Sequence, residues 1–173
     1  MKESFNKNLT QLESGDIDKV ELALSSIVSE GNKEAIPYLL QTLRSTEDAN
    51  IRNAIALALS DLQAHEAVAA LLEIIKNPKH KGFTGTLLYA LQNLDCKDYF
   101  LDFIHILGEG TFENSEMALG LIEKYADDVD YGVRLEAINT LKSFKKGQSP
   151  EFASSKYDNL HYIEHALKLL LDY

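Results

Sequence analysis

The protein has 173 residues, close to the size of one average domain, and 45% of them are hydrophobic, as in ordinary globular proteins. Asp and Glu (27) outnumber Lys and Arg (17), and the net charge of −10 argues against a protein that binds duplex nucleic acid. The single cysteine, Cys96, excludes an internal disulfide framework and a cysteine-rich zinc site. Only 9 Gly and 3 Pro interrupt the chain, so we expect long helices joined by short turns.

The sequence carries no targeting pattern that we recognise. Residues 1–12 lack the apolar run of a secretory signal, and no stretch approaches the roughly 18 apolar residues that a spanning helix needs. A lone cysteine is typical of a reducing compartment. We therefore expect a cytoplasmic protein that does not enter a membrane.

Three equally spaced segments share one pattern of apolar residues. They cover residues 35–43, 67–75 and 99–107. Apolar side chains recur in each at intervals of three and four, which places them on one face of a helix. The members are Ile36, Leu39, Leu40 and Leu43, then Val68, Leu71, Leu72 and Ile75, then Phe100, Phe103, Ile104 and Leu107. Their constant spacing is within the range of known helical repeats and predicts a repeat protein.

The segments between these helices repeat as well. The stripe Ile51, Ala54, Ile55, Ala58, Leu59 and Leu62 recurs one period later as Phe83, Thr86, Leu87, Ala90, Leu91 and Leu94, and almost one period earlier as Val20, Ala23, Leu24, Ile27, Val28 and Gly31. The register slips across residues 108–114 and resumes at Ala118, Leu121, Ile122, Tyr125, Ala126 and Val129. Each unit is thus a pair of amphipathic helices. Such a unit buries its apolar face by stacking on its neighbours, which predicts an all-α fold, an α-solenoid.

The last third of the chain departs from this period. Val133, Ala137, Leu141 and Phe144 mark a helix over about residues 130–145. A polar stretch rich in Pro, Gly and Ser follows and predicts an insertion loop at 146–157. A final apolar helix within residues 158–172 is expected to cap the stack. We find no linker, so we predict one repeat domain over residues 1–173, with its repeats at about 16–145.

Two of the second helices carry a recognisable family motif. Residues 47–59 have an acidic turn, an Ile-Arg pair at Arg52 and then small and apolar residues, and residues 128–141 follow the same order around Arg134. Both segments resemble HEAT repeats, although the copies at Glu21 and Thr84 lack the arginine. The resemblance implies a right-handed α-solenoid of about four to five helix pairs with a C-terminal capping helix. It also implies a protein-binding scaffold, with the arginines paired to acidic turns and capping carbonyls of neighbouring repeats.

One short motif in the last helix is typical of a zinc enzyme. Residues 161–165 match H-x-x-E-H, the inverted zincin motif, in which His161 and His165 share a helix face and Glu164 acts as base. That family takes its third metal ligand from well downstream, and only eight residues follow here. We therefore interpret both histidines as surface or boundary residues and predict no metal site.

Other catalytic interpretations are weaker still. His65 and Glu66 are similar to the His-Glu pairs of deoxyhypusine hydroxylase, a HEAT-like di-iron enzyme, but the equivalent pairs at 33–34 and 97–98 contain no histidine. Cys96 has no adjacent base that the sequence identifies. HEAT-like DNA glycosylases need a basic groove, and no motif selects the HEAT-like bilin lyases. We predict a non-catalytic protein without cofactors, with a bilin lyase or metal-dependent enzyme as the catalytic alternative.

A surface remains as the predicted functional feature. In HEAT-like stacks the second helices line the concave face, and their positions outside the core carry acids, amides and a tyrosine, a mixture that suits protein recognition. The predicted partner-binding residues are Glu21, Arg52, Asn53, Tyr89, Gln92, Asn93, Glu116 and Glu123.

The predicted function is binding of a partner protein by a chain that is monomeric on its own. In its most concrete form the chain is an immunity or antitoxin-type inhibitor of a basic toxin, because a charge of −10 speeds association with a basic target. Loops at 108–114 and 146–157 would then reach the toxin's active site. A general adaptor or scaffold is the alternative within the same class.

Overall fold

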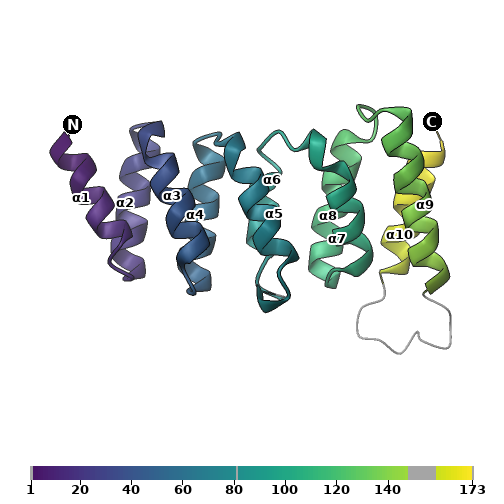
Figure 1. The fold of residues 1–173 in the computed structure, drawn as a ribbon, viewed down its shortest axis with the longest axis horizontal. Helices are drawn as coiled ribbons and strands as arrows, with labels where there is room; N and C mark the ends of the chain where they lie inside the picture. Colours follow the sequence, from purple (N-terminus) through teal and green to yellow (C-terminus); the bar gives the residue numbers. More distant parts are fainter. Residues whose placement is uncertain (1, 81, 148–158, 173) are drawn as a thin grey trace. The chain divides into compact units, whose positions relative to one another are not determined.

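The protein is described by a computed structural model that covers residues 2–80, 82–147 and 159–172. Its helices pack in adjacent pairs, and the chain divides into two compact units, Met1–Asp95 and Cys96–Tyr173, called here the N-terminal and the C-terminal unit (Figure 1). This arrangement confirms the all-α repeat fold. That residues 1–173 form a single repeat domain stays a prediction.

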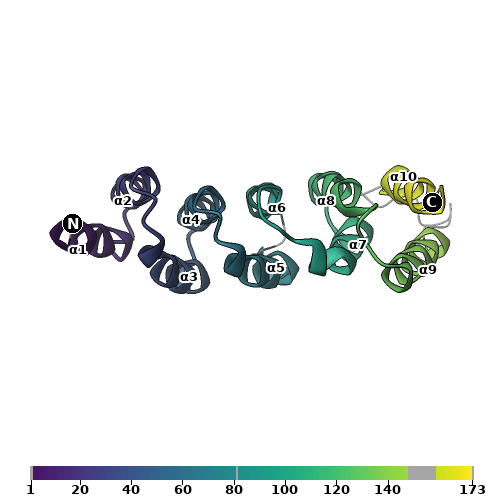
Figure 2. The same ribbon diagram turned by 90° about the horizontal axis from the view of Figure 1, so that it is seen from above.

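The N-terminal unit contains three helix pairs. Its helices are α1 (Lys2–Leu12), α2 (Ile17–Ser29), α3 (Ile36–Ser45), α4 (Ala49–Asp61), α5 (Val68–Lys76) and α6 (Gly85–Leu91). The second helices α2, α4 and α6 form one layer and the first helices α1, α3 and α5 the other (Figure 2). Each second helix of this unit therefore packs on its own partner, and α4 also packs on both α2 and α6.

The C-terminal unit contains two further pairs. Its helices are α7 (Phe100–Glu109), α8 (Phe112–Tyr125), α9 (Tyr131–Gly147) and α10 (Leu160–Leu171). First helices α7 and α9 pack on each other, as do second helices α8 and α10. One prediction is corrected by this placement, because the motif at 128–141 opens a first helix rather than a second one. Helix α10, the predicted capping helix, packs on α9 as the second helix of the last pair.

Helix α1 is a first helix that the sequence pattern did not predict. The only apolar residues on its inward face are Phe5, Leu9 and Leu12. The polar residue Asn8 also lies on this face and is only 5% exposed, so the apolar pattern is interrupted. The Nδ2 of Asn8 donates a hydrogen bond to Ser26 Oγ at 3.1 Å, so the amide is satisfied inside the first pair. The first repeat thus begins near residue 2 and not near residue 16.

The turns between pairs repeat as regularly as the helices. Short 3-10 turns at Lys33–Ala35, His65–Ala67 and Lys97–Tyr99 begin at equivalent positions of successive repeats and lead into α3, α5 and α7. Just before the first two turns, Gly31 and Gln63 occupy the left-handed region with φ of +60° and +54°. The same chain reversal therefore follows α2 and α4, with a glycine at the left-handed position in the first case and a glutamine in the second. The glutamine pays a conformational cost there that a glycine avoids.

Close contact between α7 and α9 depends on a residue without a side chain. A Cβ at Gly108 would overlap the ring of Phe144 on α9. The same ring meets the imidazole of His105 edge-on, with 5.8 Å between ring centres. The register slip predicted at residues 108–114 coincides with this contact. It also coincides with a turn of two residues between the end of α7 at Glu109 and the start of α8 at Phe112.

The insertion loop predicted at 146–157 falls almost entirely outside the described residues. Its first two positions, 146 and 147, form the end of α9, which therefore continues beyond the predicted helix.

The predicted stripes form the core of both units. Leu39, Leu71, Phe103 and Ile104 are completely buried, as are Ile55, Leu59, Leu87 and Leu91 on the second helices. Phe83 is an exception, because it precedes α6 and is 65% exposed.

We predict that Leu71→Ala and Ile104→Ala each lower the free energy of unfolding by roughly 2–5 kcal/mol, since each removes a completely buried side chain and leaves a cavity. Urea denaturation followed by circular dichroism measures the change. The matched control is Leu22→Ala, at a leucine that is 66% exposed, which should stay within about 0.5 kcal/mol of the unchanged protein. An equal loss at all three positions would contradict the assignment of the core.

Candidate functional site

Six of the eight predicted partner-binding residues belong to the N-terminal unit. Glu21 lies on α2, Asn53 on α4 and Tyr89 on α6, while Gln92 and Asn93 follow the end of α6. Glu21, Tyr89 and Asn93 are exposed, and the other two are half-buried. The second helices thus present five of these six side chains at least partly to solvent.

Arg52 is the exception, and the prediction that it contacts a partner is corrected. Its side chain is only 3% exposed, and its Nη1 donates to the backbone carbonyl of Thr46 at 3.4 Å. Arg134 behaves alike, with Nη2 donating to the carbonyl of Ala126 at 2.6 Å. The arginines therefore cap carbonyls, as the family resemblance implied. Arg134 of α9 does so at the end of α8 in the neighbouring pair, whereas Arg52 of α4 does so at the end of α3 in its own pair.

Two exposed leucines on the same helices were not predicted. Leu22 on α2 is 66% exposed and Leu57 on α4 is 37% exposed. The predicted residue Tyr89 on α6 is 52% exposed. Leu57 and Tyr89 are one repeat apart, so they occupy equivalent positions on the adjacent helices α4 and α6. The sequence did contain a signal for this pair, because a large apolar or aromatic residue recurs one repeat apart at a position outside the buried stripe. Together these residues define the second-helix surface: Glu21, Leu22, Asn53, Leu57, Tyr89, Gln92 and Asn93.

Hydrogen bonds hold the α4 and α6 parts of this surface in register. Ser60 Oγ, buried on α4, donates to the carbonyl of Ala90 at 2.9 Å. Asn93 Nδ2 donates in turn to Ser60 Oγ at 3.4 Å. A buried hydroxyl satisfied in this way fixes the neighbouring helices, so Leu57 and Tyr89 are presented on a rigid support.

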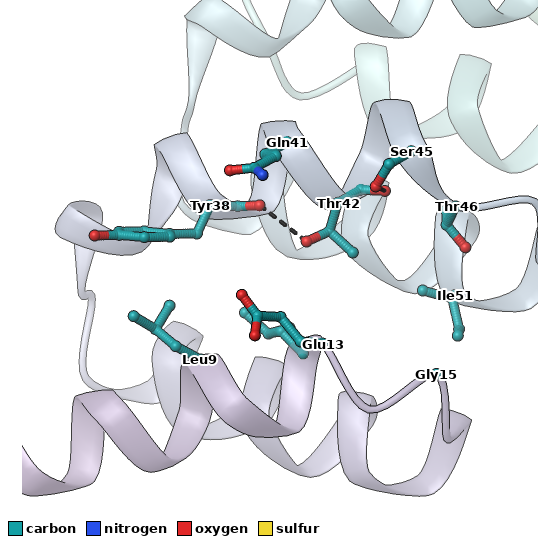
Figure 3. Close-up of a pocket in the computed structure, with 10 residues that line it drawn as sticks. Leu9, Glu13, Gly15, Tyr38, Gln41, Thr42, Ser45, Thr46 and Ile51 are labelled. Atoms are coloured by element: carbon teal, nitrogen blue, oxygen red, sulfur yellow. Dashed lines mark hydrogen bonds between the residues drawn. The ribbon is translucent and has the colours of Figure 1, made fainter.

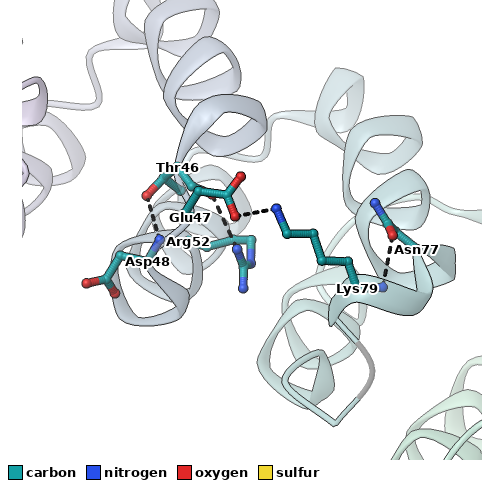
Figure 4. A network of polar contacts seen from close by, with 6 residues as sticks. All are labelled: Thr46, Glu47, Asp48, Arg52, Asn77 and Lys79. Atoms are coloured by element: carbon teal, nitrogen blue, oxygen red, sulfur yellow. Dashed lines mark hydrogen bonds and ion pairs between the residues drawn. The ribbon is translucent and has the colours of Figure 1, made fainter.

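A second polar network joins the turn before α4 to the 3-10 turn before α6 (Figure 4). Lys79 Nζ lies 2.6 Å from Glu47 Oε2, and this ion pair lowers the pKa of the Glu47 carboxyl below its usual range. His80 lies in the same place, and burial together with the charges of Arg52 and Lys79 lowers the pKa of its imidazole. The network connects residues one repeat apart at the surface.

We predict that Lys79→Ala raises the pKa of Glu47 toward the ordinary value of glutamate, because the ammonium is the main cause of the lowered pKa. A pH titration of the Glu47 carboxyl by NMR measures this. Since the folded-state pKa is lowered, the pair stabilises the protein above the ordinary pKa, and this small effect disappears as the pH falls through the lowered value. An unchanged midpoint would show that the pair does not form in solution.

The remaining two predicted residues, Glu116 and Glu123, lie on α8 in the C-terminal unit. Both are exposed, and with Glu113 they lie on one face of the helix, three and seven residues apart. Glu123 Oε1 accepts from His165 Nε2 at 3.0 Å. Burial and the nearby Glu116 carboxylate raise the pKa of Tyr162, which packs beneath this face.

The H-x-x-E-H residues of α10 contact three different groups. His165 bonds to Glu123, Glu164 pairs with Lys145 at 2.8 Å, and His161 stacks against Tyr162 with 3.7 Å between ring centres. The ring of Phe112 adds a further aromatic contact to His161, at 5.9 Å. The three side chains therefore do not converge on one point, as a shared metal ion would require.

Other sequence-predicted chemical groups also have structural partners. His65 Nδ1 accepts a hydrogen bond from the backbone N–H of Asp95 at 3.0 Å, which links α5 to the turn after α6. Cys96 is completely buried, and its backbone N–H donates to the hydroxyl of Tyr125 at 3.0 Å. Within residues 2–80, 82–147 and 159–172, no group of three or more His, Cys, Asp or Glu side chains is placed to hold a metal ion.

Comparison with known protein families agrees with this architecture. A family model for HEAT repeats matches residues 6–92, which span the three pairs from α1 to the end of α6. The chain therefore belongs to the HEAT repeat family, whose members typically mediate protein–protein interactions. No curated protein matches the sequence. None of the described helices is both long and apolar enough to cross a lipid bilayer.

Proposed function

We propose that the chain binds a basic partner protein through the second-helix surface and performs no catalysis itself. The observation that carries the proposal is the exposure of Leu22, Leu57 and Tyr89 on three successive second helices. Large apolar and aromatic side chains surrounded by polar groups are typical of the centre of a protein interface. The exposed amide of Asn93 on the same surface adds a hydrogen-bonding group.

The charge of the chain supports the choice of a basic partner. A net charge of −10 attracts a basic protein over a distance of about one Debye length and raises the rate of association. Rim charges act mainly on that rate, whereas buried apolar contacts act on the lifetime of the complex. Acidic Glu21 and the apolar Leu57 would therefore contribute in different ways.

We predict that Leu57→Asp or Tyr89→Ala weakens partner binding at least tenfold, because each removes an apolar contact at the centre of the second-helix surface. Partners recovered by affinity purification and quantified by mass spectrometry identify the target, and calorimetry with the purified target gives the affinity. Circular dichroism establishes that the variants are folded.

The matched controls are Leu171→Asp and Tyr131→Ala in the C-terminal unit, at side chains that are 56% and 78% exposed. They make the same chemical changes outside the second-helix surface and should leave the affinity unchanged. A partner that binds all four variants equally, or a partner that is itself acidic, would refute the proposal.

In its most concrete form the partner is a basic toxin and the chain is its immunity protein. Small size, acidity and a rigid binding surface support this form, as does the turn between α7 and α8, where Phe112 is 51% exposed. We expect the recovered target to be a toxic enzyme, with activity that falls to zero at one equivalent of the chain and is restored by Leu57→Asp. Recovery of a resident complex whose activity does not change would favour the adaptor role instead.

A further inference from the structure

A groove in the N-terminal unit lies apart from the second-helix surface, between the first helices α1 and α3 (Figure 3). It has a volume of about 290 Å³. Apolar side chains of Leu9, Leu12 and Ile51 line it, and at one end the rings of Phe5 and Tyr38 meet edge-on with 6.0 Å between centres. The groove is large enough for one long side chain.

Two hydroxyl oxygens of the groove are available as hydrogen-bond acceptors, while the amide of Gln41, which also lines it, can both donate and accept. The hydroxyl of Thr42 donates to the carbonyl of Tyr38 at 3.0 Å, and that of Ser45 donates to the carbonyl of Thr42 at 3.4 Å. Their protons are thus used within α3, so the oxygen lone pairs remain for a ligand. Thr46 Oγ1 already accepts from the backbone of Asp48 at 3.2 Å.

Glu13 supplies the charge. Its exposed carboxylate lies between α1 and α3, beside Leu9 and facing Thr42 (Figure 3). It is the one ionisable side chain besides Tyr38 among the described residues that line the groove. An ionised carboxylate only accepts hydrogen bonds, so this set of groups selects a ligand that is rich in donors and positively charged.

We infer that the groove binds an arginine or lysine side chain of the basic partner protein. The aliphatic stem packs on Leu9, Leu12 and Ile51, and the cationic head meets Glu13 and the Thr42 oxygen, since both side chains combine an apolar stem with a head that only donates. The inference deepens the proposed function and rests on it for the nature of the partner. It adds a contact on the first-helix side of the same unit.

The test uses short capped peptides and the full-length chain, so it does not depend on finding the partner. Acetyl-Gly-Arg-Gly-amide and its lysine analogue are titrated into the isotope-labelled protein, and amide shifts are followed by NMR. We expect shifts concentrated at residues 9–15 and 38–46, with a dissociation constant on the order of millimolar. The norleucine peptide, which keeps the stem without the charge, should bind more weakly.

Glu13→Gln removes the charge with little change of shape and should weaken binding of the arginine peptide by about threefold or more. Glu73→Gln, at an exposed glutamate of α5 that lies outside both the groove and the second-helix surface, is the matched control and should have no effect. The inference is overturned if both variants change the affinity equally or if the shifts spread over all acidic faces. Free arginine binding tenfold tighter than the capped peptide would identify a small metabolite instead and would also overturn it.

The two proposals fail in different ways. If Glu13→Gln weakens peptide binding but Leu57→Asp does not weaken partner binding, the groove assignment stands and the second-helix surface is refuted. The opposite result would refute the groove alone.

Discussion

The structure depends on one constraint, that no helix pair of this protein can bury its apolar residues alone. A first helix such as α5 has buried residues on more than one face, including Leu71 and Leu72, and so needs neighbours on several sides. Stacking of equivalent helices meets this requirement only if successive pairs keep the same register. The constant repeat spacing, the recurring 3-10 turns and the hydrogen bond from Ser60 to Ala90 all follow from that need.

The helices with strong apolar periodicity could be predicted from the sequence because burial dictates residue type along a stripe. Helix α1 could not, since Asn8 fills a buried position and its hydrogen bond to Ser26 is a tertiary contact. The layer of α9 was also missed, because the local motif around Arg134 resembles the start of a second helix although α9 is a first helix. Which layer a helix joins is decided by packing between α7 and α9, which no local pattern encodes.

The candidate surface was predictable in outline for the same reason. Positions outside the buried stripe face solvent, and Glu21 and Tyr89 are accordingly exposed on their helices, as is Asn93 just after α6. Arg52 was misplaced because a long cationic side chain can fold inward when a backbone carbonyl is there to receive it. The groove beside Glu13 was invisible to the sequence, since it arises from the spacing of α1 and α3 rather than from any residue pattern.

Three bonds that join repeats within the N-terminal unit connect residues at nearly constant separation along the chain. His65 and Asp95, Ser60 and Ala90, and Glu47 and Lys79 are 30, 30 and 32 residues apart. Chain closures of this length cost little conformational entropy compared with contacts across a whole domain. We therefore expect folding to begin where neighbouring pairs stack and to spread from there along the repeats.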